Sequence, residues 1–168
     1  MPDVLTHVLV GYSLGTLLRL SNDRLRPAHV TLVMLGALSP DLVKVRILLP
    51  SAAVDALLAV PFSWDPLHTL GGSVLVGGLG ALLVGPDQRR TVLALLAVGA
   101  VSHHALDLLL LKASGYAYPV FWPLTQYHPP AGGLYLSSDR WPAVAAGGVA
   151  AVLWAVTRTR ARATDSTA

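Results

Sequence analysis

The stretch VGAVSHHALDLLLLK, residues 98–112, is apolar apart from its terminal lysine and the polar side chains of Ser102, His103, His104 and Asp107. The run predicts a helix, in which His103 and Asp107 lie one turn apart and leave the same face one above the other. Two ionisable groups placed in this way inside an apolar helix suit a shared ligand. What surrounds the helix and what the two side chains bind must be inferred from the rest of the chain.

The composition indicates a membrane protein. Of the 168 residues, 54% are apolar and 12% are charged, whereas soluble domains carry about 25% charged residues. We predict an all-α integral membrane bundle, with one membrane-embedded helical domain over residues 1–157 and a disordered basic tail over residues 158–168. The chain has no cysteine, which excludes disulfides and thiolate metal sites.

Five apolar runs predict the membrane helices, although a span takes about 20 apolar residues and some of these runs are shorter. The runs cover residues 4–20, 28–43, 67–85, 91–111 and 142–157. A break or kink is expected at Pro40, because proline lacks a backbone donor and disfavours helix in the residue before it. Residues 51–60 predict a short helix at the membrane interface. The glycines of the third run favour close approach of neighbouring helices.

The basic residues predict the orientation. One set of connections carries eight of them: Arg19, Arg24, Arg26, Arg89, Arg90, Arg158, Arg160 and Arg162. The other side keeps Lys44, Arg46, Lys112 and Arg140. The positive-inside rule then places the N-terminus outside and the C-terminus in the cytoplasm. Because the basic residues follow topology and form no continuous stripe, we expect no nucleic-acid partner.

The same topology brings ionisable side chains from four helices toward the outer face. His7, Asp41 and His68 lie near the outer ends of the first three helices, and His103 and Asp107 lie in the outer half of the fourth. An Asp near the centre of a span costs about 2.5 to 3.5 kcal/mol, so mutual pairing or a bound cation is needed. We predict that these five residues bind a divalent metal in a water-filled pocket open to the outside. His and Asp suit zinc, manganese or iron.

Four motifs resemble a known family, the membrane-bound metal-dependent hydrolases labelled LexA-binding, inner-membrane-associated hydrolases. The motifs are THVLVG (6–11), GALSPD (36–41), HTLGGS (68–73) and SHHALD (102–107), followed by the segment SGYAYPVFWPL (114–124). The family is distantly similar to zinc-dependent phospholipases C. The resemblance therefore implies hydrolysis of an ester or phosphoester by a metal-activated water.

Two departures from the family pattern concern the number of metals. Many members carry a second acid in the form Pro-Asp-x-Asp, where this chain has Val43, and WDPL (64–67) replaces a His-Arg-Gly form before His68. These departures put a second metal in doubt, although Asp65 offers a carboxylate from another place.

The candidate catalytic residues are Asp107 and Asp41. The chain contains no glutamate, so a general base must be an Asp or a His. His104 points about 100° away from His103 around the helix, which favours a packing or supporting role. We leave His29 and His128 out of the site as an interfacial and a loop residue.

Each predicted ligand also has a purely structural interpretation. His103 and Asp107 could form a buried hydrogen-bonded pair between helices. His68 could simply stand at an interfacial helix start, Asp41 could cap a helix after Pro40, and His7 could pack through one hydrogen bond.

Two classes of function fit these observations. The first is a membrane-embedded, metal-dependent hydrolase that acts on a small-molecule or lipid-derived ester or phosphoester at the extracytoplasmic face. The second is a non-enzymatic protein that binds or transports metal ions or protons. A conduit needs polar groups along its whole depth, and the inner halves of these helices hold almost none, which favours the one-sided site. A non-catalytic membrane adaptor is a third class, distinguished by failure to bind metal.

A reporter fused after residue 160 should lie in the cytoplasm and one inserted near residue 130 should lie outside, because eight of the twelve basic residues fall on the first side. Reporter enzymes that are active on only one side of the membrane measure this. A cytoplasmic location of the 112–140 loop would contradict the face assigned to the site.

Overall fold

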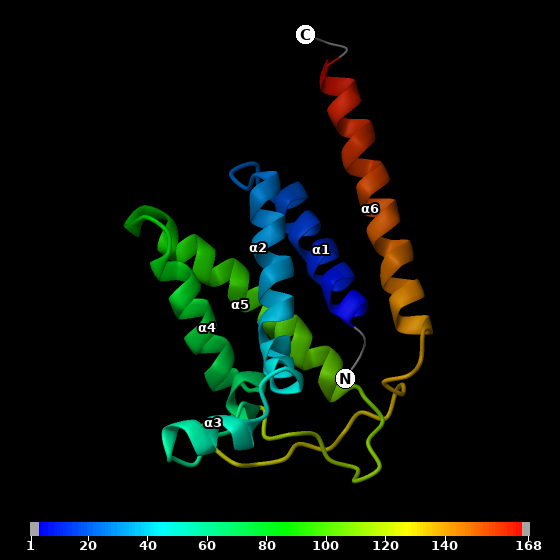
Figure 1. The fold of residues 1–168 in the computed structure, drawn as a ribbon. Coiled ribbons are helices and arrows are strands. Elements are labelled where there is room, and N and C mark those ends of the chain that lie inside the picture. The colour runs from blue at the N-terminus through cyan, green and yellow to red at the C-terminus, as the bar shows by residue number, and fades with distance from the viewer. Residues whose placement is uncertain (1–3, 166–168) are drawn as a thin grey trace.

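The computed structural model describes residues 4–165, and over that range the chain is helical with no strand (Figure 1). The elements are α1 (Val4–Ser21), α2 (Pro27–Leu38), the 3₁₀ helix η1 (Ser39–Ile47), α3 (Ser51–Leu58), the 3₁₀ helix η2 (Asp65–His68), α4 (Leu70–Leu82), α5 (Pro86–Leu108) and α6 (Trp141–Asp165). The predicted all-α membrane bundle of about five helices and one short helix is confirmed.

Within residues 4–165, three helices are long and apolar enough to cross a membrane. They lie at Val4–Ser21, Pro86–Leu108 and Trp141–Arg160. In contrast, α2 and α4 have 12 and 13 residues, or about 18 and 20 Å at 1.5 Å per residue, less than the hydrocarbon core of about 30 Å. α4 is therefore shorter than the third predicted run. α2 ends at Leu38, which confirms the break expected at Pro40, and the chain continues as η1.

The helices alternate in direction along the chain (Figure 1). The α1–α2 connection, the α4–α5 turn and the end of α6 lie at one end of the molecule, whereas α3 and the segment between α5 and α6 lie at the other. These are the same two groups of connections that the basic residues predicted. Which end faces the cytoplasm stays a prediction.

Two helix ends differ from the sequence-based boundaries. α5 ends at Leu108, before the predicted end at 111, so Asp107 lies in its last turn. α6 continues to Asp165, past residue 157, where we predicted that a disordered tail begins. Residues 166–168 of that tail lie outside the described residues.

Glycines allow α2 and α5 to cross with their backbones in direct contact. A Cβ at Gly99 of α5 would overlap the carbonyl oxygen of Val33, and a Cβ at Gly36 of α2 would overlap the carbonyl of Leu96. The close approach expected from the glycines of α4 is found at Gly80, where a Cβ would lie 3.0 Å from the Leu96 side chain of α5, and at Gly72, where it would overlap the carbonyl oxygen of Pro66. A Cβ at Gly78 would meet nothing within 4 Å. The direct backbone contact between α2 and α5 supports the site described below.

The substitution Gly99→Ala should destabilise the fold by about 1–3 kcal/mol or more, because neither backbone can retreat from the added methyl group without moving a helix. Thermal unfolding in detergent measures the change. Gly78→Ala is the matched control and should leave the melting temperature unchanged or slightly higher. Equal effects of the two substitutions would contradict the close crossing.

Candidate metal centre

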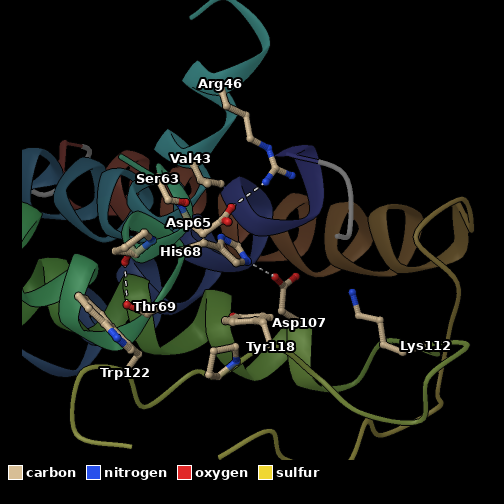
Figure 2. Close-up of a pocket in the computed structure, with 12 residues that line it drawn as sticks. Val43, Arg46, Ser63, Asp65, His68, Thr69, Asp107, Lys112, Tyr118 and Trp122 are labelled. Atoms are coloured by element: carbon tan, nitrogen blue, oxygen red, sulfur yellow. Dashed lines mark hydrogen bonds and ion pairs between the residues drawn. The ribbon is translucent and has the colours of Figure 1, made fainter. Parts of the chain in front are cut away.

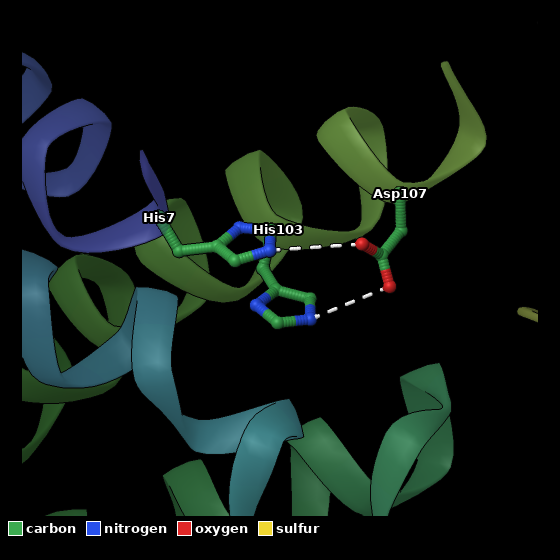
Figure 3. A group of neighbouring side chains, drawn as sticks. All are labelled: His7, His103 and Asp107. Atoms are coloured by element: carbon green, nitrogen blue, oxygen red, sulfur yellow. Dashed lines mark ion pairs between the residues drawn. The ribbon is translucent and has the colours of Figure 1, made fainter. Parts of the chain in front are cut away.

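The five predicted ligands come together, buried, at one end of the bundle. His7 and His103 are 0% exposed, Asp107 is 1%, Asp41 is 8% and His68 is 9%. They come from α1, η1, η2 and α5. Figure 3 shows His7 of α1 beside His103 and Asp107 of α5.

Asp107 faces three imidazoles. Its Oδ2 lies 2.7 Å from Nε2 of His68 and 3.7 Å from Nε2 of His103, and its Oδ1 lies 3.6 Å from Nε2 of His7. His103 shares a face of α5 with Asp107 through the one-turn spacing. The rings of His7 and His103 stack with centroids 3.8 Å apart.

Two overlapping groups could hold a metal ion. One consists of His7, His103 and Asp107, and the other of Asp41, His68 and His103. Within each group the ligand atoms lie within 4.8 Å of one another. His103 belongs to both groups, so the five side chains form one continuous cluster.

Two backbone carbonyls set the orientation of the imidazoles. Nδ1 of His103 donates to the carbonyl of Ala37 at 2.7 Å, and Nδ1 of His68 donates to the carbonyl of Pro40 at 3.0 Å. Ala37 lies in the last turn of α2, where carbonyls lack intrahelical partners. Because a carbonyl only accepts, each bond fixes the proton on Nδ1 and turns Nε2 toward Asp107.

Several buried atoms of the cluster lack a hydrogen-bond partner among the described residues. They are Nδ1 and Nε2 of His7, Oδ1 of Asp41, Nε2 of His103 and Oδ1 of Asp107. Buried polar groups without partners are costly. A cation satisfies lone pairs of nitrogen and oxygen at once, and this donor set suits zinc. The residues present therefore fit a divalent metal.

The donor set matches one cation better than two. His103 is in both groups, yet only its Nε2 is available because Nδ1 is bonded to Ala37. One neutral imidazole nitrogen has one lone pair and binds one metal. His68 likewise has only Nε2 available, because its Nδ1 is bonded to Pro40, and this Nε2 lies 2.7 Å from Oδ2 of Asp107.

The two other carboxylates considered in the sequence differ in their surroundings. Asp41 accepts a hydrogen bond from Lys44 at 2.7 Å through Oδ2, rather than capping a helix as in the alternative interpretation. Asp65 pairs with Arg46 at 2.9 Å and belongs to neither metal group. The structure thus brings Asp41 into the cluster and leaves Asp65 outside it.

A hydrogen-bonded chain of side chains behind His68 was not predicted from the sequence. Ser73 donates to the carbonyl of Thr69 at 3.0 Å, so its oxygen accepts from Nε2 of His104 at 2.8 Å. Nδ1 of His104 then accepts from the hydroxyl of Tyr118 at 2.8 Å. The Tyr118 ring centroid lies 4.5 Å from that of His68. His104 thus lies in this chain and in neither metal group. Tyr118 lies near a helix end, a position that is also typical of the aromatic belt of membrane proteins.

Burial raises the pKa of Tyr118, and the carboxylates of Asp107 and Asp41 raise it further. Its phenol therefore stays protonated and able to donate to His104. The only sequence signal for Tyr118 is its place in the aromatic and proline segment after the SHHALD motif.

A cavity of about 620 Å³ opens beside the cluster (Figure 2). Among the predicted ligands, His68 and Asp107 line it. The volume falls in the range of small-molecule sites, about 300–1,000 Å³. His7 and His103 are fully buried, so the cavity reaches the cluster through His68 and Asp107.

The two histidines left out of the site lie elsewhere. Nδ1 of His29 accepts from the backbone of Arg26 at the start of α2. Nδ1 of His128 donates to the carbonyl of Ala117 in the segment between α5 and α6. Neither belongs to a metal group.

Comparison with known proteins shows the family. The family model described as YdjM inner membrane protein matches residues 1–164. The chain therefore belongs to the YdjM inner membrane protein family, and its apolar helices agree with a membrane location. No curated protein and no solved structure matches the chain.

Zinc added to chelator-treated protein should raise the melting temperature, because binding to the folded state alone stabilises by about 2.7 kcal/mol at a hundredfold excess over Kd. His103→Ala and Asp107→Asn should abolish the shift, and His29→Ala should retain it. Elemental analysis should find one ion per chain. Two ions per chain would contradict the single-cation assignment, and an unchanged shift in Asp107→Asn would remove Asp107 from the site.

Proposed function

We propose that this member of the YdjM inner membrane protein family is a membrane-embedded hydrolase that uses one divalent cation, preferably zinc, to cleave an ester or phosphoester at the extracytoplasmic face. One observation carries the proposal. A cluster of three imidazoles and two carboxylates, with buried atoms that lack partners, lies beside a cavity of substrate size.

His7, Asp41, His68, His103 and Asp107 would hold the cation. When bound, a divalent cation lowers the pKa of water and polarises the bond under attack. The protein's own contribution is to orient the ligands. The carbonyls of Ala37 and Pro40 hold two imidazoles, and the burial of His7 and His103 keeps bulk water away from the inner side of the cluster.

Asp107 is the residue of the cluster best placed to accept a proton. It lines the cavity together with His68. Because Nδ1 of His68 is bonded to Pro40, His68 would hold the cation through Nε2, and a carboxylate oxygen of Asp107 is left to take the proton that an attacking water must lose. Asp41 does not line the cavity, and Lys44 engages its Oδ2. We therefore assign Asp107 to proton transfer and cation binding, and Asp41 to cation binding.

The distribution of buried ionisable groups supports a one-sided site over a conduit. Among residues 4–160, the buried histidines and aspartates are His7, Asp41, His68, His103, His104 and Asp107. All of them belong to the cluster or contact it. The buried polar side chains of α1 farther along the helix are the hydroxyls of Ser13 and Thr16, which do not carry charge through the membrane.

Asp107→Asn should lower the rate of metal-dependent hydrolysis by at least about a hundredfold. The substitution keeps the size of the side chain and removes the charge that faces three imidazoles. Release of chromophore from phosphoester and carboxylester substrates measures it, with and without chelator. Circular dichroism confirms that the helices persist.

His29→Ala is the control, since His29 lies outside both metal groups, and it should keep wild-type activity. Wild-type protein that holds one ion but hydrolyses no ester of either kind would favour metal binding or transport. Protein that holds no metal would favour an adaptor.

A further inference from the structure

We propose that the cavity beside the cluster binds an amphiphile with an anionic phosphate headgroup, the headgroup lying between Lys112 and the His68–Asp107 pair and the apolar chain lying against the opposite wall. This inference deepens the proposed function, since it names the substrate class of the same site. It depends on the proposed function in one respect, which is that the divalent cation is bound.

Of the charged residues that line the cavity, some form an ion pair and one does not (Figure 2). Arg46 and Asp65 form an ion pair at 2.9 Å, so their charges largely cancel. Lys112 extends alongside Asp107 in Figure 2, and in the described part of the chain no hydrogen bond or ion pair of its ammonium group is found. Lys112 is therefore a positive charge available to a ligand.

The balance of charge around the cluster favours an anionic headgroup. The carboxylates of Asp41 and Asp107 together neutralise a divalent cation. Lys44, which does not line the cavity, bonds to Asp41 at 2.7 Å. Lys112 remains as the positive charge that lines the cavity without an ion-pair partner among the described residues. A phosphate ester brings one or two negative charges to such a site, whereas a neutral carboxylester brings none.

The rest of the cavity suits a hydrocarbon chain. Val43, Pro119 and Trp122 contribute apolar wall. Ile47 and Leu48, which follow the wall-forming part of η1, are 76% and 88% exposed. Apolar side chains this exposed on a membrane protein are expected to face lipid. A ligand with a chain can therefore reach the cavity from the bilayer.

The test is binding, so it does not depend on turnover. Hexadecylphosphonate carries the anionic headgroup on a bond that hydrolases of esters do not cleave. Titration into detergent-solubilised, zinc-loaded full-length protein, followed by calorimetry, should show one saturable site. Methylphosphonate, which has the headgroup without the chain, and hexadecanol, which has the chain without the charge, should each bind at least about tenfold more weakly.

Charge variants locate the site. Lys112→Gln should weaken hexadecylphosphonate binding by roughly 3- to 10-fold, and Arg140→Gln, a basic residue that does not line the cavity, should leave it unchanged. Arg46→Gln should weaken binding and Asp65→Asn should strengthen it, while the double variant should bind like wild type because the two charges cancel.

The outcomes separate this inference from the proposed hydrolase. Binding of hexadecylphosphonate by protein that hydrolyses nothing supports the inference and contradicts the hydrolase. Hydrolysis of neutral esters by protein that does not bind hexadecylphosphonate overturns the inference and leaves the hydrolase standing. Equal affinity for methylphosphonate, or equal affinity of the Lys112→Gln variant, also overturns it.

Discussion

A carboxylate without solvent, at the end of an apolar helix, is the constraint on which the rest of this structure depends. Asp107 is 1% exposed and cannot be paired from within α5 alone. Its partners must come from α1, η2 and a second position of α5, and they do so through His7, His68 and His103. The helices are thus arranged around a charge as well as around an apolar core. Each additional imidazole lowers the free-energy cost of burying the Asp107 carboxylate.

The interruption of α2 connects the fold to this site. Pro40 ends the regular helix, and the carbonyls of Ala37 and Pro40 are then available to hold the rings of His103 and His68. The direct backbone contact at Gly36 and Gly99 brings α2 close enough to α5 for the first of these bonds. A single short segment therefore contributes the helix end, the close crossing and the orientation of two imidazoles.

The sequence predicted the helices and the convergence of His7, Asp41, His68, His103 and Asp107, because both follow from local periodicity and from alternation of helix direction. The end of α2 was also predicted, because a break was expected at Pro40. The length of α4 and the role of Tyr118 were not predicted. Hydropathy counts apolar residues whether or not they are helical, so the third predicted run began at residue 67, before the capped start of α4. Tyr118 lies in the segment between α5 and α6, whose path depends on tertiary contacts. From sequence alone, a tyrosine near a span end that bonds to a buried histidine cannot be distinguished from one that lies in the aromatic belt.

The short length of α4 also bears on the surrounding lipid. The helix turns Val74, Leu75, Leu79 and Leu82 outward along a rod of only about 20 Å, whereas an unperturbed bilayer presents about 30 Å of hydrocarbon. Such hydrophobic mismatch is relieved when the bilayer thins beside the protein. Thinning on this flank would bring the headgroup layer toward His68, which immediately precedes the capped start of α4. Under the proposed function, a site at this depth would meet its lipid ligand without extracting it fully from the membrane.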